Sequence, residues 1–162
     1  MGPIGALGLN ELIFRLTIAV IIGSLLGLNR ELHGKAAGLR THALVALGAA
    51  IVAILAVQVE NNVIGVDPNA LSRIIQGTLT GIGFLGAGVI LRGTDEHVSG
   101  LTTAATIWIC AVIGLICGLA YWELVGVATS LVLTVLVFGP IVERIGLRIF
   151  KKRLKPPTKD DA

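Results

Sequence analysis

The sequence predicts an all-α, polytopic membrane protein with five transmembrane helices, and three observations predict it. Hydrophobic residues make up 54% of the 162 residues and charged residues only 14%, whereas a soluble domain carries about 25% charged residues. The apolar residues form five long stretches, each close to the roughly 20 residues that cross a bilayer as a helix. The charged residues gather between and after these stretches. Lipid, rather than water, must therefore surround most of the chain.

The five apolar stretches differ in their flanking residues, length and composition. The segment before the first has no basic residue and no small-residue cleavage site, so the first stretch is expected to remain as a helix. The second is short for a span, and the third is rich in glycine. The fourth and fifth are separated only at Tyr121, Trp122 and Glu123, which predicts a tight hairpin with aromatic side chains at the headgroup level. The predicted spans are residues 12–28, 43–59, 71–91, 101–120 and 122–142.

The basic residues predict the orientation. Of the 13 lysines and arginines, all but Arg15 and Arg73 lie in the first connection, the third connection or the segment after the last span. These three segments fall on one side of a five-span path, and an excess of basic residues marks the cytoplasmic side. The N-terminus is therefore predicted outside and the C-terminus in the cytoplasm. Residues 1–142 form the transmembrane domain and residues 143–162 a basic tail, whose helical first part is expected to lie on the anionic cytoplasmic leaflet.

Arg15 and Arg73 each lie near the outer end of a predicted span. We expect both to snorkel to the outer headgroups, because a charge inside the membrane is costly. Glu11 precedes Arg15 at a favourable helical ion-pair spacing. The alternative is that the two arginines face a polar vestibule between helices.

The run GIGFLG in the third span has the G-x-G-x-x-G spacing of a dinucleotide-binding turn. Its context is wrong for that site, because apolar segments flank it and no acidic residue follows at the required distance. We interpret the glycines as helix-packing positions that let backbones approach closely, with the third span central and neighbours on two faces. The alternative is an unwound helix that exposes carbonyls to an ion. The predicted packing positions are Gly77, Gly81, Gly83, Gly86 and Gly88.

The fourth span carries a strip of small or polar residues that is expected to pack on the third span. Ser99 precedes this span and is predicted to be its N-cap, with an anion on the free amides as the alternative. The strip consists of Thr102, Thr106, Cys110, Gly114 and Gly118.

The first connection holds the densest group of charged side chains. Arg40 is predicted either to pair with Glu31 across the hairpin or to bind an anionic lipid headgroup. A lone Glu31 does not predict a metal site, because a hard cation requires several oxygen ligands. We find no catalytic set and no P-loop, so we predict a non-enzymatic protein without a cofactor or a bound metal, and nothing indicates a nucleic-acid partner.

Three stretches in order, GLNRELHGKAAGLRTHALVALGAA, IIQGTLTGIGFLGAGVILRG and GLTTAATIWICAVIGLICGLAYW, resemble the MgtC/SapB family of bacterial membrane proteins over residues 12–142. The resemblance implies an inner-membrane protein linked to growth under magnesium limitation and, in pathogens, to virulence. The resemblance implies an acidic residue and an arginine where this chain has Asn29 and Ser99, and we expect no C-terminal regulatory domain after the tail. The family motifs fall on Arg30, Glu31, Gly38, Leu39, Arg40 and Thr41, on Gly81, Gly83, Gly86 and Gly88, and on Gly100, Leu101, Thr102 and Thr103.

Two functions follow as hypotheses. The first is a regulator that docks on a partner membrane ATPase, such as the ATP synthase, or that adjusts the membrane potential. The second is a small oligomeric transporter or channel for Mg²⁺ or another ion. A homodimer through the glycine face of the third span is compatible with both. The residues that would line a polar path are Gln76, Thr78, Thr80, Thr102, Thr103 and Thr106.

Overall fold

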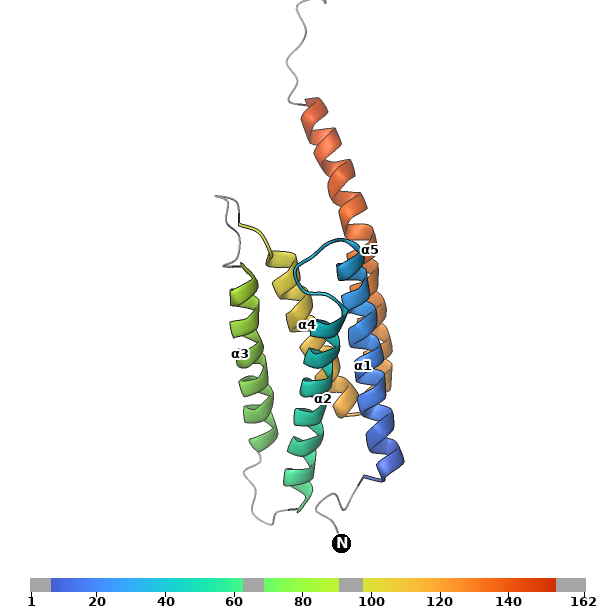
Figure 1. Ribbon diagram of the computed structural model, residues 1–162, viewed down its shortest axis with the longest axis vertical. Helices are drawn as coiled ribbons and strands as arrows, with labels where there is room; N and C mark the ends of the chain where they lie inside the picture. The colour runs from blue at the N-terminus through green and yellow to red at the C-terminus, as the bar shows by residue number, and fades with distance from the viewer. Residues whose placement is uncertain (1–6, 63–68, 91–97, 154–162) are drawn as a thin grey trace, which may run out of the picture. The chain divides into compact units, whose positions relative to one another are not determined.

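The computed structural model describes residues 7–62, 69–90 and 98–153, which are helical and contain no strand. Each of its helices is long and apolar enough to cross a membrane, which confirms the predicted fold class (Figure 1). The helices are α1 (Leu9–Leu32), α2 (Leu39–Asn62), α3 (Ala70–Ile90), α4 (Leu101–Gly118) and α5 (Trp122–Arg153).

Each helix overlaps its predicted span. α1, α2 and α5 extend beyond the predicted residues, whereas α4 ends at Gly118 rather than at residue 120. α1 continues beyond the predicted residues 12–28 at both ends, and α2 begins at Leu39 and so includes Arg40 and His42. The predictions stopped near the first charged residue. A helix satisfies its own backbone hydrogen bonds wherever it lies, so it has no reason to end where the apolar side chains end.

Contacts divide the chain into two compact units, the first ending at Thr129 and the second beginning at Ser130. The first unit contains α1–α4 and the start of α5. The second is the rest of α5, which continues as a helix through Pro140 to Arg153 although proline cannot donate a backbone hydrogen bond. The predicted binding of this segment to the leaflet stays a prediction, and the end of the tail lies outside the described residues.

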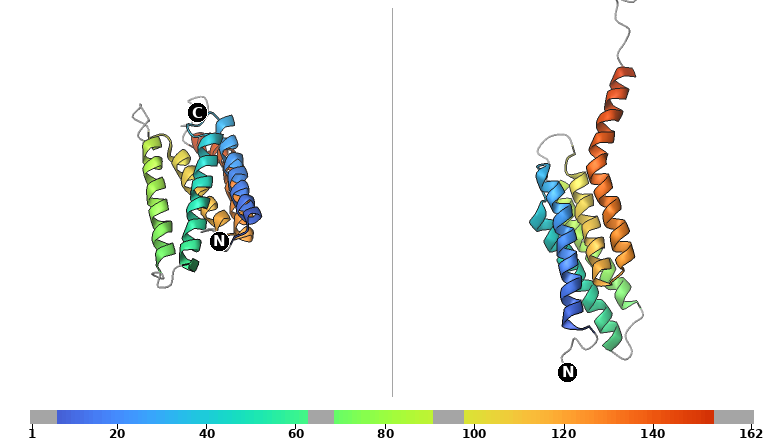
Figure 2. Two further views of the ribbon diagram at one scale, coloured as in Figure 1. Left: turned by 60° about the horizontal axis from the view of Figure 1, so that its bottom comes forward. Right: turned by 90° about the vertical axis from the view of Figure 1, so that its right-hand side faces the viewer.

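Within the first unit, α1–α4 run alternately up and down (Figure 1). α4 contacts α1, α2 and α3, and α2 contacts α1, α3 and α4. Buried residues make up 56% of the α4 span and 0% of the α3 span. α3 lies at the edge of this unit (Figure 2). The prediction that the third span is central is therefore wrong, because α2 and α4 occupy the centre.

The small residues of α1 and α4 bring both helices onto the backbone of α2. A Cβ atom at Gly23 or Gly27 of α1 would lie 2.6 Å from a carbonyl oxygen at the start of α2. A Cβ atom at Gly114 would collide with the Ala46 backbone, and one at Gly118 would lie 2.5 Å from the Ala50 oxygen. The strip on α4 therefore faces α2 and not α3, which corrects the predicted partner. α2 matches it with buried alanines at Ala46, Ala49, Ala50, Ala53 and Ala56.

α3 and α4 do pack together, but mainly through aliphatic side chains of α3. Ile75, Leu79 and Ile82 pack against the core formed by α2 and α4. Gly86 lies next to Ala104, 3.5 Å from a Cβ atom built at the glycine, while Gly77, Gly81, Gly83 and Gly88 have no atom within 4 Å of such a Cβ atom. α3 is also one continuous helix, so the alternative of an unwound ion-binding segment is wrong. Among the described residues, the glycine face of α3 is therefore uncovered at these four positions.

Two helices end in the same hydrogen-bonded turn, the Schellman motif. At the end of α1, Gly34 has φ +64°, and the amides of Gly34 and Lys35 donate to the carbonyls of Glu31 and Arg30. At the end of α4, Ala120 has φ +60°, and the amides of Ala120 and Tyr121 make the equivalent bonds to Cys117 and Ile116. The turn satisfies helix carbonyls that would otherwise lack partners.

Candidate functional site

A buried polar cluster lies where α1 ends and where α2 and α4 begin. We call this end of the first unit the basic end, because it carries Arg30, Lys35 and Arg40. Arg30 belongs to the last turn of α1, yet only 6% of it is exposed. Its Nη2 donates a hydrogen bond of 2.7 Å to Oγ1 of Thr103 on α4. The buried Thr106 hydroxyl donates to the Thr103 carbonyl at 2.8 Å, so the cluster joins α1 to the first turns of α4.

His42 is the α2 member of this cluster and is fully buried. Its Nδ1 lies 3.0 Å from the Gly38 carbonyl oxygen. Because a carbonyl can only accept, Nδ1 carries the proton and Nε2 is an acceptor in the neutral ring. The His42 carbonyl in turn accepts from the Cys110 thiol of α4 at 3.3 Å. In the described part of the chain, neither His42 Nε2 nor Arg30 Nε has a hydrogen-bond partner.

The charge of Arg30 is not balanced by the neighbouring acid. Oε2 of Glu31 accepts a hydrogen bond of 2.9 Å from the backbone amide of Leu39. This contact places a carboxylate on the first amide of α2, where the helix dipole favours negative charge. The ion pair found among the described residues joins Arg15 and Glu11 at the other end of α1. A buried charge without an opposite charge beside it is strongly unfavourable. The Arg30 guanidinium is therefore a candidate functional or ligand-binding group.

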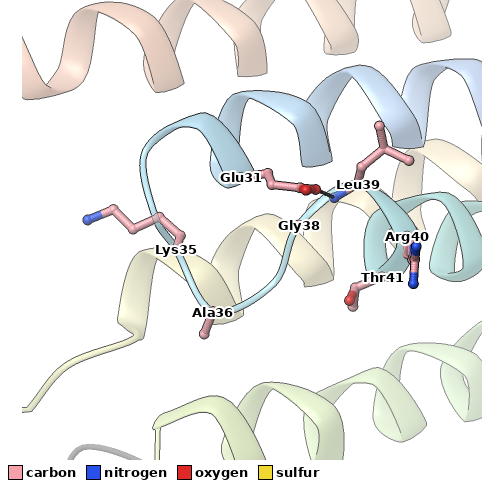
Figure 3. A pocket seen from close by; sticks show the side chains of 7 residues that line it. All are labelled: Glu31, Lys35, Ala36, Gly38, Leu39, Arg40 and Thr41. Atoms are coloured by element: carbon pink, nitrogen blue, oxygen red, sulfur yellow. Dashed lines mark hydrogen bonds between the residues drawn. The ribbon is translucent and has the colours of Figure 1, made fainter.

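The first connection forms an open pocket of about 540 Å³ beside this cluster. Figure 3 shows Glu31 pointing to the start of α2, while Lys35 and Arg40 extend in different directions. Arg40 is exposed and Glu31 binds the Leu39 amide instead, so the predicted Arg40–Glu31 ion pair is wrong. Five of the six predicted motif residues line this pocket, and the sixth, Arg30, belongs to the buried cluster instead. The full lining is Glu31, Lys35, Ala36, Gly38, Leu39, Arg40 and Thr41.

The start of α4 differs from the prediction. Its N-cap is Gly100, with φ +85° and no side-chain hydrogen bond to the first turn, so the prediction of a Ser99 cap is wrong. A Cβ atom at Gly100 would lie 2.9 Å from the Val89 carbonyl oxygen at the end of α3. The left-handed backbone and this close approach both require glycine. They leave the first amides of α4 without the cap that Ser99 was expected to supply.

At the other end of the first unit, Arg15 binds protein rather than headgroups. Its Nε donates to Glu11 and its Nη1 donates to the carbonyl oxygen of Gly118, each at 2.8 Å. The guanidinium thus caps the C-terminus of α4, where a positive charge complements the helix dipole. The snorkelling prediction is therefore wrong for Arg15.

The residues proposed for a polar path do not form one line in this chain. Thr103 and Thr106 are buried in the polar cluster, whereas Thr102 is exposed on α4 and Gln76 is exposed on α3. Sequence reasoning did not identify His42, because in the sequence it stands at the end of a polar connection and nothing distinguishes it from the other polar residues there. It also missed Gly23 and Gly27, although their G-x-x-x-G spacing was a visible signal.

The fold and this cluster define a class of protein, a polytopic helical membrane protein with a buried cation at one end of its bundle. The profile of the MgtC family matches residues 16–145. Protein SrpB of Synechococcus elongatus is 47% identical over 118 residues, which cover 68% of this chain and 65% of SrpB. The protein named "Putative magnesium transporter YhiD" of Escherichia coli K12 is 40% identical over 144 residues, covering 88% and 65%. Protein MgtC of Salmonella typhimurium LT2 is 41% identical over 121 residues, covering 75% and 49%.

The chain belongs to the MgtC family. It is a multi-pass protein of the bacterial inner membrane, and its relatives include one named as a putative magnesium transporter. The matched part amounts to about half to two thirds of the length of these curated relatives. No solved structure matches the chain.

Proposed function

We propose that this chain is a non-enzymatic regulator in magnesium homeostasis, which acts by docking on a partner in the inner membrane. The partner is a membrane ATPase such as the ATP synthase, and the effect is a change in its activity or in the membrane potential. Anionic lipids of the cytoplasmic leaflet are expected at the basic end. The proposal rests on the family and on the geometry of the bundle, and the family relatives themselves are longer than the matched region.

The observation that carries this proposal is the direct packing of backbones between α1, α2 and α4. At Gly23, Gly27, Gly114 and Gly118 there is no room for even a methyl group against α2. Glycine contacts of this kind favour rigid helix association through van der Waals packing. They also fill the centre of the first unit with backbone, so a partner must bind on its outer surface, and the partner sites in this proposal are the surface of α3 and the basic end.

A second candidate, a transporter built from several copies, is favoured by one observation. Gln76 and Thr80 are exposed on α3, on a surface that would face lipid in a single copy. The Thr80 hydroxyl donates to the Gln76 carbonyl at 2.8 Å and needs no other partner. A polar side chain in lipid is costly, so a path lined by Gln76 would have to lie between copies.

Ion flux in liposomes separates the two functions. The purified protein is reconstituted into vesicles that contain a magnesium-sensitive dye, with an ionophore as the positive control. We expect no saturable Mg²⁺ entry above that of empty vesicles. Saturable Mg²⁺ entry that disappears in a Gln76→Leu variant would contradict the regulatory function and support transport instead.

The partner is identified by affinity purification from native membranes followed by mass spectrometry. We expect a membrane ATPase subunit to co-purify with the wild-type chain. A Gly114→Leu variant, which cannot form the α2–α4 contact, serves as the control for the folded bundle. Recovery of the same proteins with both variants would mean that the capture is unspecific.

A further inference from the structure

The two helices that begin at the basic end, α2 and α4, differ in the capping of their first turns. The first amide of α2 is occupied by the Glu31 carboxylate at 2.9 Å. The first turn of α4 receives no side-chain cap, since its N-cap residue is Gly100. The first amides of a helix have no intrahelical partner and carry the positive end of the helix dipole. Among the described residues, no side chain caps the first amides of α4, whereas the Glu31 carboxylate already occupies the first amide of α2.

A second and independent observation points to the same turn. Arg30 is more than nine-tenths buried, and its Nη2 lies 2.7 Å from Oγ1 of Thr103, in the first turn of α4. Its Nε has no hydrogen-bond partner among the described residues. The guanidinium thus brings a full positive charge, through its Nη2, to a helix start that already attracts anions. The Thr103 hydroxyl accepts from Arg30, so its own proton is available to donate.

We propose that the first turn of α4, together with Arg30, forms a binding site for a phosphate oxyanion. Thr103 and Arg30 supply the inner donors, and the exposed Thr102 supplies the outer one. The Val89 carbonyl lies beside Gly100 and repels an anion, which confines the site to the face of the turn that Arg30 and Thr103 share. The phosphate comes from the headgroup of an anionic lipid or from inorganic phosphate, because the same donors recognise both.

Phosphate is favoured over a carboxylate by the number of candidate donors. They are a guanidinium, hydroxyls and backbone amides, and a phosphate offers more oxygens to accept from them than a carboxylate does. The position also fits, because a span begins near the membrane surface. This proposal does not depend on the proposed regulatory function.

The test measures binding to the full chain in a detergent without phosphate, such as dodecyl maltoside. Inorganic phosphate is titrated by equilibrium dialysis, with sulfate and chloride at matched ionic strength. Phosphatidylglycerol is added to parallel samples, and retained lipid is counted by native mass spectrometry, with phosphatidylcholine as the control. We expect one saturable site for phosphate, for phosphatidylglycerol or for both, and the responding probe identifies the source.

The variants test the residues. Arg30→Gln should weaken binding of the responding probe at least tenfold. Thr103→Val leaves the Arg30 charge in place and keeps the shape of the side chain at position 103, and it should weaken binding several-fold. For inorganic phosphate, the matched control is Arg40→Gln, which removes an exposed cation from the same end and should change phosphate binding less than twofold. Thr103→Val remains decisive if Arg30→Gln does not fold. Wild-type protein that binds neither probe saturably overturns the proposal, as does an equal loss of inorganic phosphate binding in Arg40→Gln.

Discussion

At the scale of single residues, the two Schellman turns provide a comparison within one molecule. Gly34 and Ala120 occupy the same left-handed position at the ends of α1 and α4, with φ of +64° and +60°. Glycine adopts this conformation without strain, whereas an L-residue with a Cβ atom pays about 1–2 kcal/mol. α4 therefore carries a strain that α1 avoids.

We predict that exchanging these residues changes stability in opposite directions. Ala120→Gly should raise the midpoint of thermal unfolding in detergent, and Gly34→Ala should lower it, each by about 2–4 °C. A Cβ atom at Gly34 meets nothing within 4 Å, so only the backbone conformation is altered there. Tryptophan fluorescence measures the midpoint. Shifts of the same sign in both variants would show that another effect dominates.

The buried arginines show what could be predicted about single residues. The sequence located Arg15 and Arg30 at span ends, and the Glu11 spacing correctly indicated a partner for Arg15. It could not reveal that Arg15 also caps α4 or that Arg30 binds Thr103, because these contacts join residues on different helices. A pattern along the chain reports neighbours on one helix only.

At the scale of helices, the glycines divide into those that contact a neighbour and those that do not. Gly114 and Gly118 meet the backbone of α2, whereas Gly48 has no atom within 4 Å of an added Cβ atom. Inserting a methyl group into a closely packed contact costs about 1–3 kcal/mol. Small-residue contacts are also the main source of helix association in lipid.

We predict that Gly114→Ala lowers the unfolding midpoint clearly, while Gly48→Ala leaves it unchanged or slightly higher because alanine favours the helix. Both variants add one methyl group to a helix interior, so the comparison isolates packing. Thermal aggregation followed by size-exclusion chromatography measures the change. Equal midpoints for the two variants would disprove the close contact with Ala46.

The faces of the helices were better predicted than their partners. The strip from Thr106 to Gly118 does pack closely, but on α2, and the α3 glycines were assigned to contacts that aliphatic residues make instead. Spacing identifies which residues share a face. It does not state which neighbour covers that face, since several helices in this chain offer small residues.

The homodimer through the glycine face of α3 remains a prediction, because the described residues leave most of these glycines without a neighbour. Gly81→Leu places a large side chain where no atom of the same chain lies within 4 Å, so it should leave the monomer folded and disrupt the dimer. Crosslinking in detergent, with Gly48→Leu on α2 as the control, measures the dimer. A dimer that persists in Gly81→Leu would place the interface on another surface.

At the scale of the whole molecule, the orientation in the membrane is the main prediction that remains. The positive-inside rule predicts that Lys35 at the basic end faces the cytoplasm and that Asn69 at the start of α3 faces outside. A membrane-impermeant maleimide should label Asn69→Cys in intact cells and Lys35→Cys only after the membrane is opened. The two native thiols are buried, which limits background labelling. Labelling of Lys35→Cys in intact cells would reverse the topology.

The number and order of the spans could be predicted because the bilayer imposes a length and a composition on each of them. Most residues of the motif in the first connection line one pocket, since they are close in sequence, and the functional role of the motif stays a prediction. The buried polar cluster was not identified as a whole. His42 and Arg30 come from separate helices and join Thr103 from a third, and only the packed bundle brings them together.

The bond between Arg15 and the Gly118 carbonyl has a consequence for biogenesis, because it joins positions 103 residues apart. The ribosome delivers α1 long before the end of α4 exists. During synthesis the guanidinium must remain solvated at the membrane surface, and the Gly118 carbonyl gains this partner only when α4 arrives beside α1. The earlier of the two helices thus completes the end of a much later one, so the bundle can close only after translation has passed that point.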